Sequence, residues 1–209
     1  MENSSNRLAA RRRRSPLTLA AILLAPLLLA ACARPSESDM ATRLTEAMEC
    51  KWMEVADFKR TDSLPGMWSY IGQYSFLLKM KDGDEGARNF YSGLLSAMPA
   101  GEKDLKKALY SSQAQAYVRT ECTEGAAAVL NQLSNHVLNQ LDDREPQARL
   151  PVVVPMTGWA EFANTKNGWV MDVRREKIEG AFVYAEPMKW DQIAPQAGSI
   201  FRQPEEKTK

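Results

Sequence analysis

The chain has 209 residues and carries 27 Lys and Arg against 26 Asp and Glu, with charges of both signs interspersed. This balance leaves no basic face for nucleic acid and no strong field that would steer an anionic ligand. The chain also has no internal repeat, Gly-rich phosphate loop or Gly-x-Ser-x-Gly motif, which argues against the common enzyme classes that use them.

The chain begins with a basic and then apolar leader. Arg7 and Arg11 to Arg14 form the positive segment, and an apolar run from Leu17 to Ala31 follows. This run is shorter than the about 20 residues of a membrane-spanning helix, and Pro26 would cost roughly 3 kcal/mol inside one. Residues 1–31 are therefore predicted to be a cleaved secretion signal.

Leu29-Ala30-Ala31-Cys32 closes this leader with small residues directly before a cysteine. The pattern resembles the signal peptide of bacterial lipoproteins. The resemblance implies that Cys32 becomes the N-terminus, that its thiol is acylated, and that the protein is anchored in a membrane of the cell envelope. In that class Ala33 implies the outer membrane, facing the periplasm, with the inner membrane as the alternative. An ordinary secretory leader cleaved after Ala-x-Ala is the other interpretation.

Removal of the leader leaves 178 residues with 22 basic and 25 acidic side chains, a net charge of about −3. This length suffices for one domain with a buried core. We expect a lipidated tether over 32–39, a single globular domain over 40–186 and an irregular C-terminal tail over 187–209.

Two cysteines remain once Cys32 is acylated. Cys50 and Cys122 are then the only pair in an oxidising compartment, so we expect a disulfide between them. Closing that loop would stabilise the fold by about 4 kcal/mol in the chain-entropy picture. Two free thiols or a redox pair are the alternative, although no Cys-x-x-Cys motif supports redox activity.

The first half of the domain predicts a helix, a strand and a second helix. Apolar residues recur at helical spacing from Ala41 to Val55, which predicts an amphipathic helix. Alternation of apolar and polar residues from Tyr70 to Lys81 predicts a strand. An Asp- and Gly-rich turn at 82–86 follows, and the stripe from Ala87 to Met98 predicts a helix that a proline ends.

Two helical segments are expected next. Residues 102–120 permit either a helix or a strand, and we favour the helix. An apolar stripe through 123–143 predicts a longer amphipathic helix beneath a face of Asn and Gln.

Beyond Pro146 the pattern changes to strand. Val152 to Val154 is β-branched, and Asn167-Gly168 favours a two-residue type I′ turn in a hairpin. Phe182 to Tyr184 predicts a short last strand.

The expected turn also sets a register for the hairpin. It pairs Phe162 with Val173 on one face and Glu161 with Arg174 on the other. One pair is apolar and the other has opposite charges, so the pattern and the turn agree.

The order of elements predicts an α+β fold, with several amphipathic helices packed on a small antiparallel sheet that ends in a C-terminal β-hairpin. In outline this arrangement is similar to NTF2-like folds, a likeness that rests on no diagnostic motif.

Residues that could carry chemistry are sparse. His136 is the only histidine and lies off the apolar stripe of its helix, so we expect a solvated side chain and no metal or nucleophile-histidine site. The turn at 82–86 lacks the ligand spacing of a calcium loop. The carboxylate pairs Asp142-Asp143 and Glu121 with Glu124 would need burial to act as general acids. No metal, cofactor or catalytic residue is expected.

A partner surface is the better-supported expectation. The predicted hairpin places Trp159 on the same face as Glu161 and Arg174, opposite the face that carries Trp169. An exposed Trp beside a charged pair is typical of a protein or glycan contact, and a second packing layer over that face is the alternative.

We therefore expect a non-catalytic envelope lipoprotein that binds a protein partner as an accessory or assembly factor, and that also contacts the membrane through Cys32. The alternative is a lipid- or small-ligand-binding domain, suggested by the aromatic and Met-rich segment from Tyr70 to Met98. A carboxylate-based envelope hydrolase is the third hypothesis, and it requires two acids that converge in a cleft.

Overall fold

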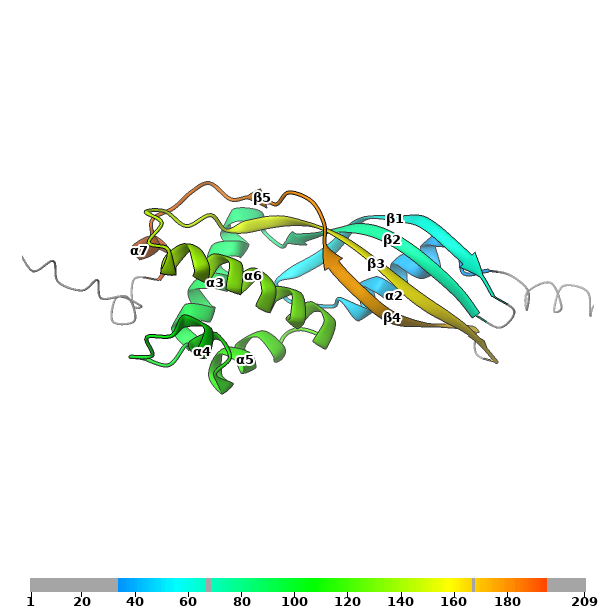
Figure 1. The fold of residues 1–209 in the computed structure, drawn as a ribbon, viewed down its shortest axis with the longest axis horizontal. Coiled ribbons are helices and arrows are strands. Elements are labelled where there is room, and N and C mark those ends of the chain that lie inside the picture. The colour runs from blue at the N-terminus through cyan, green and yellow to red at the C-terminus, as the bar shows by residue number, and fades with distance from the viewer. Residues whose placement is uncertain (1–33, 67–68, 167, 195–209) are drawn as a thin grey trace, which may run out of the picture. The chain divides into compact units, whose positions relative to one another are not determined.

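A computed structural model describes residues 34–66, 69–166 and 168–194, in which an antiparallel sheet packs against helices (Figure 1). The strands are β1 Met53–Pro65, β2 Ser69–Met80, β3 Pro151–Thr165, β4 Gly168–Ile178 and β5 Val183–Tyr184. The helices are α2 Glu37–Ala47, α3 Gly83–Ala97, α4 Leu105–Leu109, α5 Ser112–Arg119, α6 Glu124–Asp142 and α7 Trp190–Ile193. The expected α+β class is confirmed, and β3 and β4 form the C-terminal hairpin.

The strands follow the order β1-β2-β3-β4, and every neighbouring pair is antiparallel. The long strand β3 has two partners along one edge. Its last residues pair with β4, while Pro151 and Val153 at its start pair with Tyr184 and Val183 of β5. The sheet therefore has a hairpin end, where the β1–β2 and β3–β4 turns lie, and an opposite end that includes β5 (Figure 1).

The central strands of the sheet are buried on one face. In β2, alternate residues from Tyr70 to Met80 are buried, and those between them are half-buried or exposed. The predicted alternation in this strand is therefore confirmed. We call the buried face, which carries Tyr74 and Phe76, the inner face, and the opposite face, which carries Gln73 and Trp159, the outer face.

Helices α2 and α3 contact the sheet from opposite ends. The side chain of Met40 in α2 lies against Gly72 and Phe162 near the hairpin end, where the absence of a Cβ at Gly72 makes room for it. Helix α3 contacts β2 and β3, and α6 packs on α4 and α5. Burial of this apolar inner face against the helices supplies the main driving force for folding.

A capping box starts α2 earlier than the sequence suggested. The Ser36 hydroxyl accepts a 3.0 Å hydrogen bond from the Asp39 backbone N–H, and the Asp39 carboxylate accepts one of 2.9 Å from the Ser36 N–H. These two bonds satisfy backbone donors that would otherwise be free. The helix thus begins at Glu37, inside the 32–39 segment expected to be a tether and before Met40, where the domain was expected to begin.

The helix expected to continue to Val55 ends instead at Ala47, and β1 begins at Met53. The prediction was wrong because Trp52, just before β1, and Val55, within it, pack against the core without belonging to a helix. An apolar spacing of three or four residues therefore does not by itself require a helix here. The sequence did not predict strand β1, because the second half of this strand is mostly polar and exposed.

The chain turns between α2 and β1 where it meets the start of α6. Cys50 and Cys122 form the expected disulfide. Backbone bonds flank it on both sides, from the Lys51 N–H to the Glu121 oxygen and from the Thr123 N–H to the Glu49 oxygen, each 2.9 Å long. Because α2 ends at Ala47, the backbone groups of residues 49–51 can pair with those of residues 121–123, which are distant in sequence.

The segment 102–120 is helical, as favoured, but it forms two short helices, α4 and α5. The break falls at Ser111, whose hydroxyl accepts a 3.3 Å hydrogen bond from the Ala114 N–H and so caps α5. The long helix expected over 123–143 is present as α6.

The hairpin is present, but its register differs by two residues from the expected one. Thr165 pairs with Gly168 and Phe162 pairs with Met171, so Phe162–Val173 and Glu161–Arg174 are not directly opposite. Gly168 belongs to β4 rather than to the turn, and residue 167 lies outside the described residues. Because the shift is even, Phe162 and Glu161 keep their expected faces.

The expected last strand is confirmed as β5, and the chain then continues into the core. Ile193 of α7 is buried, and the Trp190 indole N–H donates a 2.9 Å hydrogen bond to the Glu145 carbonyl oxygen. The first residues of the expected irregular tail, 187–194, are therefore packed, whereas 195–209 lie outside the described residues.

Candidate interaction surface

The outer face of the sheet is the surface on which the sequence-predicted residues meet. Pairing across the strands places Ile71, Glu161 and Asp172 in one row, and Gln73, Trp159 and Arg175 in the next. Among the described residues, every outer-face side chain of β2, and of β3 from Val153 onward, is half-buried or exposed. A second packing layer over this part of the face is thus not present in the described part of the chain.

An arginine held by two carboxylates lies on this face. Arg174 Nη2 is 2.9 Å from Glu161 Oε2 and 3.0 Å from Asp172 Oδ2. The expected attraction between Glu161 and Arg174 is therefore realised as an ion pair, although the two residues are not directly opposite. All three side chains remain partly exposed, so each ion pair adds at most about 1 kcal/mol to stability. The larger effect of the two ion pairs is to hold the Arg174 guanidinium in one place.

Trp159 is the large exposed side chain beside this trio. It is 37% exposed, and a register shift at Trp159 and Ala160 accompanies the extra residue in β4. This irregularity inserts Arg174 between the Asp172 and Arg175 rows. The structure therefore brings Trp159, Glu161 and Arg174 together on one face.

A hollow of about 380 Å³ lies between α2 and the edge strand β4. Its lining residues are Arg43, Glu46, Ala47, Val170, Met171 and Val173. Arg43 and Glu46 form a 2.9 Å ion pair on α2, and both side chains are more than half exposed. The hollow is therefore apolar on its β4 side and charged on its helix side.

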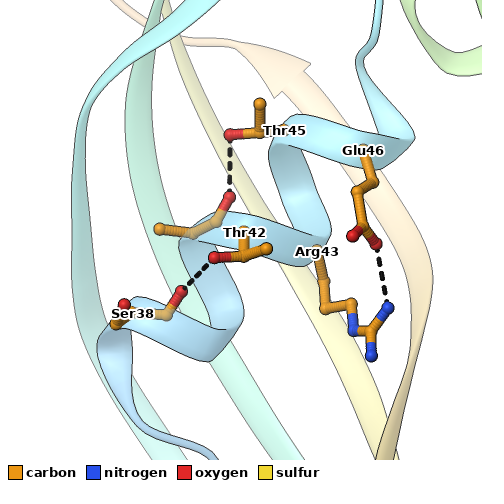
Figure 2. A network of polar contacts seen from close by, with 6 residues as sticks. Ser38, Thr42, Arg43, Thr45 and Glu46 are labelled. Atoms are coloured by element: carbon orange, nitrogen blue, oxygen red, sulfur yellow. Dashed lines mark hydrogen bonds and ion pairs between the residues drawn. The ribbon is translucent and has the colours of Figure 1, made fainter.

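The two threonine hydroxyls of α2 are engaged within the helix. Figure 2 shows that the hydroxyls of Thr42 and Thr45 turn back onto the backbone, where each donates a 2.9 Å hydrogen bond to the carbonyl oxygen four residues earlier, on Ser38 and Ala41. Such bonds satisfy hydroxyls locally. They leave the Arg43–Glu46 pair as the charged feature of α2 beside the hollow.

The inner face contains a polar pair formed by a buried tyrosine and a half-buried glutamate. The Tyr74 hydroxyl donates a 3.3 Å hydrogen bond to Glu176 Oε1, and the Tyr74 ring passes over Gly158, where a Cβ would lie 2.7 Å from it. Burial raises the pKa of Glu176 above its usual value, and the hydrogen bond from Tyr74 opposes that rise. Burial, followed by the nearby Glu176 charge, raises the pKa of Tyr74. This pair contributes to packing, with the glycine permitting the close approach.

His136 is less solvated than expected. Its Nε2 lies 3.2 Å from the Tyr184 hydroxyl, and its ring meets the Phe182 ring edge-on, with centroids 5.1 Å apart. Burial lowers the pKa of His136. The sequence could not reveal this packing because β5 reaches α6 only in the folded chain.

The candidate acids do not gather. Asp84 accepts a 3.1 Å hydrogen bond from the Glu186 backbone N–H, and Glu121 lies 3.6 Å from Lys51 Nζ at an exposed position. Asp142 and Asp143 are exposed. Within the described ranges, no group of three or more His, Cys, Asp or Glu side chains is placed to hold a metal ion.

Sequence reasoning missed two features of this region. Asp172, the second carboxylate on Arg174, was overlooked, although alternation along the expected strand places residues 172 and 174 on one face. The hollow beside α2 was missed because the helix and β4 are far apart in sequence. No local pattern signals such a contact.

No protein family, curated protein or solved structure matches this chain. None of the helices in the described part is long and apolar enough to cross a membrane. Cys32 lies outside the described residues, so the lipoprotein signal stays a prediction. The NTF2-like outline also stays a prediction, because no solved structure matches the chain.

Proposed function

We propose that the protein is a lipid-anchored envelope lipoprotein that acts as a non-catalytic accessory or assembly factor and binds a protein partner on the outer face of its sheet. The observation that carries the proposal is Trp159, an exposed indole beside an arginine that two carboxylates hold in place. Tryptophan and arginine are the side chains that most often dominate binding energy in protein interfaces.

The arrangement gives each residue a distinct role. The Trp159 ring offers a large apolar area that loses little conformational entropy on binding. Arg174 is already oriented by Glu161 and Asp172, so less ordering is needed when a partner approaches it. The outer face of an open sheet gives a broad surface, suited to a folded protein rather than to a small molecule.

A ligand-binding domain is the second candidate, and the hollow beside α2 is the observation that favours it. Its volume of about 380 Å³ lies near the lower end of the range for small-molecule sites. The aromatic residues that first suggested a ligand, such as Tyr70, Tyr74 and Phe76, are at most 2% exposed and pack in the core. We therefore prefer the partner surface.

Site-specific photocrosslinking in the host envelope tests the proposal. A photoreactive amino acid at Gln73, the exposed neighbour of Trp159 across the strands, should give a discrete crosslinked product. Trp159→Ala should weaken that product strongly, because truncation of an interface hot spot costs about 2 kcal/mol, or about 30-fold in affinity.

The control places the same photoreactive group at Tyr110, which is 58% exposed and lies on the helical side of the molecule. It should not give the Gln73 product. The proposal fails if both positions yield the same product, or if Trp159→Ala leaves the Gln73 product unchanged.

A further inference from the structure

The hairpin end of the sheet lies beside the start of α2, and therefore close to the predicted anchor. Figure 1 shows β1 running back along α2 in the opposite direction, and Met40 lies against Gly72. Ser36 is about 6 Å further toward the hairpin end, at 1.5 Å of helix rise per residue. The paired ends of β1 with β2 and of β3 with β4 lie just beyond (Figure 1).

The chain between this point and Cys32 is short. Only residues 33–35 separate Cys32 from Ser36, the cap of α2. Fully extended, such a segment spans about 14 Å. If Cys32 is acylated, Ser36 at the start of α2 cannot move more than about this distance from Cys32, whatever conformation the segment takes.

Two exposed apolar side chains lie at this end. Leu64, next to the last residue of β1, is 60% exposed, and Val170, near the start of β4, is 54% exposed. Pro65 beside Leu64 is also exposed. Exposed aliphatic residues this close to an anchored bilayer gain free energy by leaving water for its interface.

The charges at this end limit how deeply it can enter. Lys166 in the β3–β4 turn is exposed and suits lipid phosphate groups, whereas Glu37 and Asp39 in the first turn of α2 are exposed acids. Burying these carboxylates in hydrocarbon would be costly, so contact is confined to the headgroup layer.

We propose that the hairpin end of the sheet, through Leu64 and Val170, rests on the lipid surface that anchors the chain. This inference rests on the acylation of Cys32 in the proposed function. The tether holds this end at a high effective concentration near the bilayer. The two aliphatic side chains Leu64 and Val170 are therefore enough to keep the hairpin end on the lipid surface for much of the time. The sheet then stands on its hairpin end, and Trp159, which lies one row further from that end than Leu64 and Glu161, stays open to a partner.

The test uses the full chain, purified from host membranes and reconstituted into phosphatidylethanolamine–phosphatidylglycerol vesicles. Val170→Cys carries an environment-sensitive fluorophore, and Val183→Cys is the matched control. Both are exposed strand valines, at 54% and 55%, but Val183 lies in β5 at the opposite end of the sheet. Nitroxide groups attached to the lipid headgroups should quench the label at 170 several-fold more strongly than the label at 183.

Leu64→Cys provides a second position and should behave like Val170→Cys. Equal quenching at 170 and 183, or stronger quenching at 183, would overturn the inference. Mass spectrometry of the same preparation separates this failure from that of the proposed function. A Cys32 without acyl groups contradicts the anchor itself, whereas an acylated Cys32 with no difference in quenching contradicts only the orientation.

Discussion

At the scale of single residues, the inner face depends on a glycine that accommodates a tyrosine. The Tyr74 ring of β2 occupies the space over Gly158 of β3, and its hydroxyl reaches across to Glu176 of β4. Because the carboxyl is partly removed from water, its charged form is disfavoured. Glu176 is thus a half-buried acid whose protonation is coupled to folding.

The sign of this coupling can be tested with Glu176→Gln. The folded chain holds the Glu176 proton more tightly than the unfolded chain, whose pKa is near the ordinary 4.5. The stability that Glu176 contributes is therefore present in full below pH 4.5, and it is lost as the pH rises through the folded pKa. Urea unfolding from pH 4 to pH 8 should show a smaller loss of stability in the Gln variant. An identical pH dependence in both proteins would contradict the burial of this carboxyl.

At the scale of elements, local hydrogen bonds decide where α2 begins. Ser36 and Asp39 satisfy each other's backbone donors, and the hydrogen bonds from Ser36 lower the pKa of the Asp39 carboxyl. The helix therefore begins within a few residues of Cys32. This early start shortens the tether and brings the hairpin end close to the predicted anchor.

Ser36→Ala measures the contribution of this cap. The substitution should lower the free energy of unfolding by about 1 kcal/mol, the typical cost of losing an N-cap. Ser38→Ala is the matched control, since Ser38 lies inside the helix and only its carbonyl oxygen accepts a side-chain bond there. Alanine favours a helix, so this variant should be neutral or slightly stabilising. Equal destabilisation in the two variants by urea unfolding would argue against the cap.

At the scale of the whole molecule, the disulfide joins the two ends of the segment that contains β1, β2 and α3. Cys50 and Cys122 are 72 residues apart in sequence, and their link holds the α2–β1 junction against the start of α6. Long loops lose the most entropy when they close. We therefore expect the disulfide to act mainly on the unfolded chain.

The double substitution Cys50→Ala with Cys122→Ala should lower the free energy of unfolding by about 4 kcal/mol in the chain-entropy picture. The folded structure should change little, so far-UV circular dichroism of the variant should match that of the oxidised protein. The unaltered chain under reducing conditions should unfold at the same urea concentration as the variant. A variant as stable as the oxidised protein would refute this role.

Much of the candidate surface could be predicted from sequence, because strand alternation alone places Trp159 and Glu161 on one face. Arg174 followed from the hairpin, even though the expected turn was two residues off. Asp172 was missed, although alternation along the predicted strand places it on the same face as Arg174, two residues away. The irregularity at Trp159 and the true register could not be found. A turn motif indicates a local preference, and pairing along the whole strand outweighs it.

The sequence by itself determined which residues face the core in β2, α3 and α6, because apolar periodicity is a local pattern. It also indicated which cysteines pair, because Cys50 and Cys122 are the two that remain once Cys32 is assigned to the lipid anchor. Only the tertiary structure decided where α2 stops and β1 starts, how β3 and β4 align, and that Leu64 and Val170 share an end with the start of α2. The physical reason is that these features arise from contacts between segments distant in sequence, whose free energy no local pattern contains.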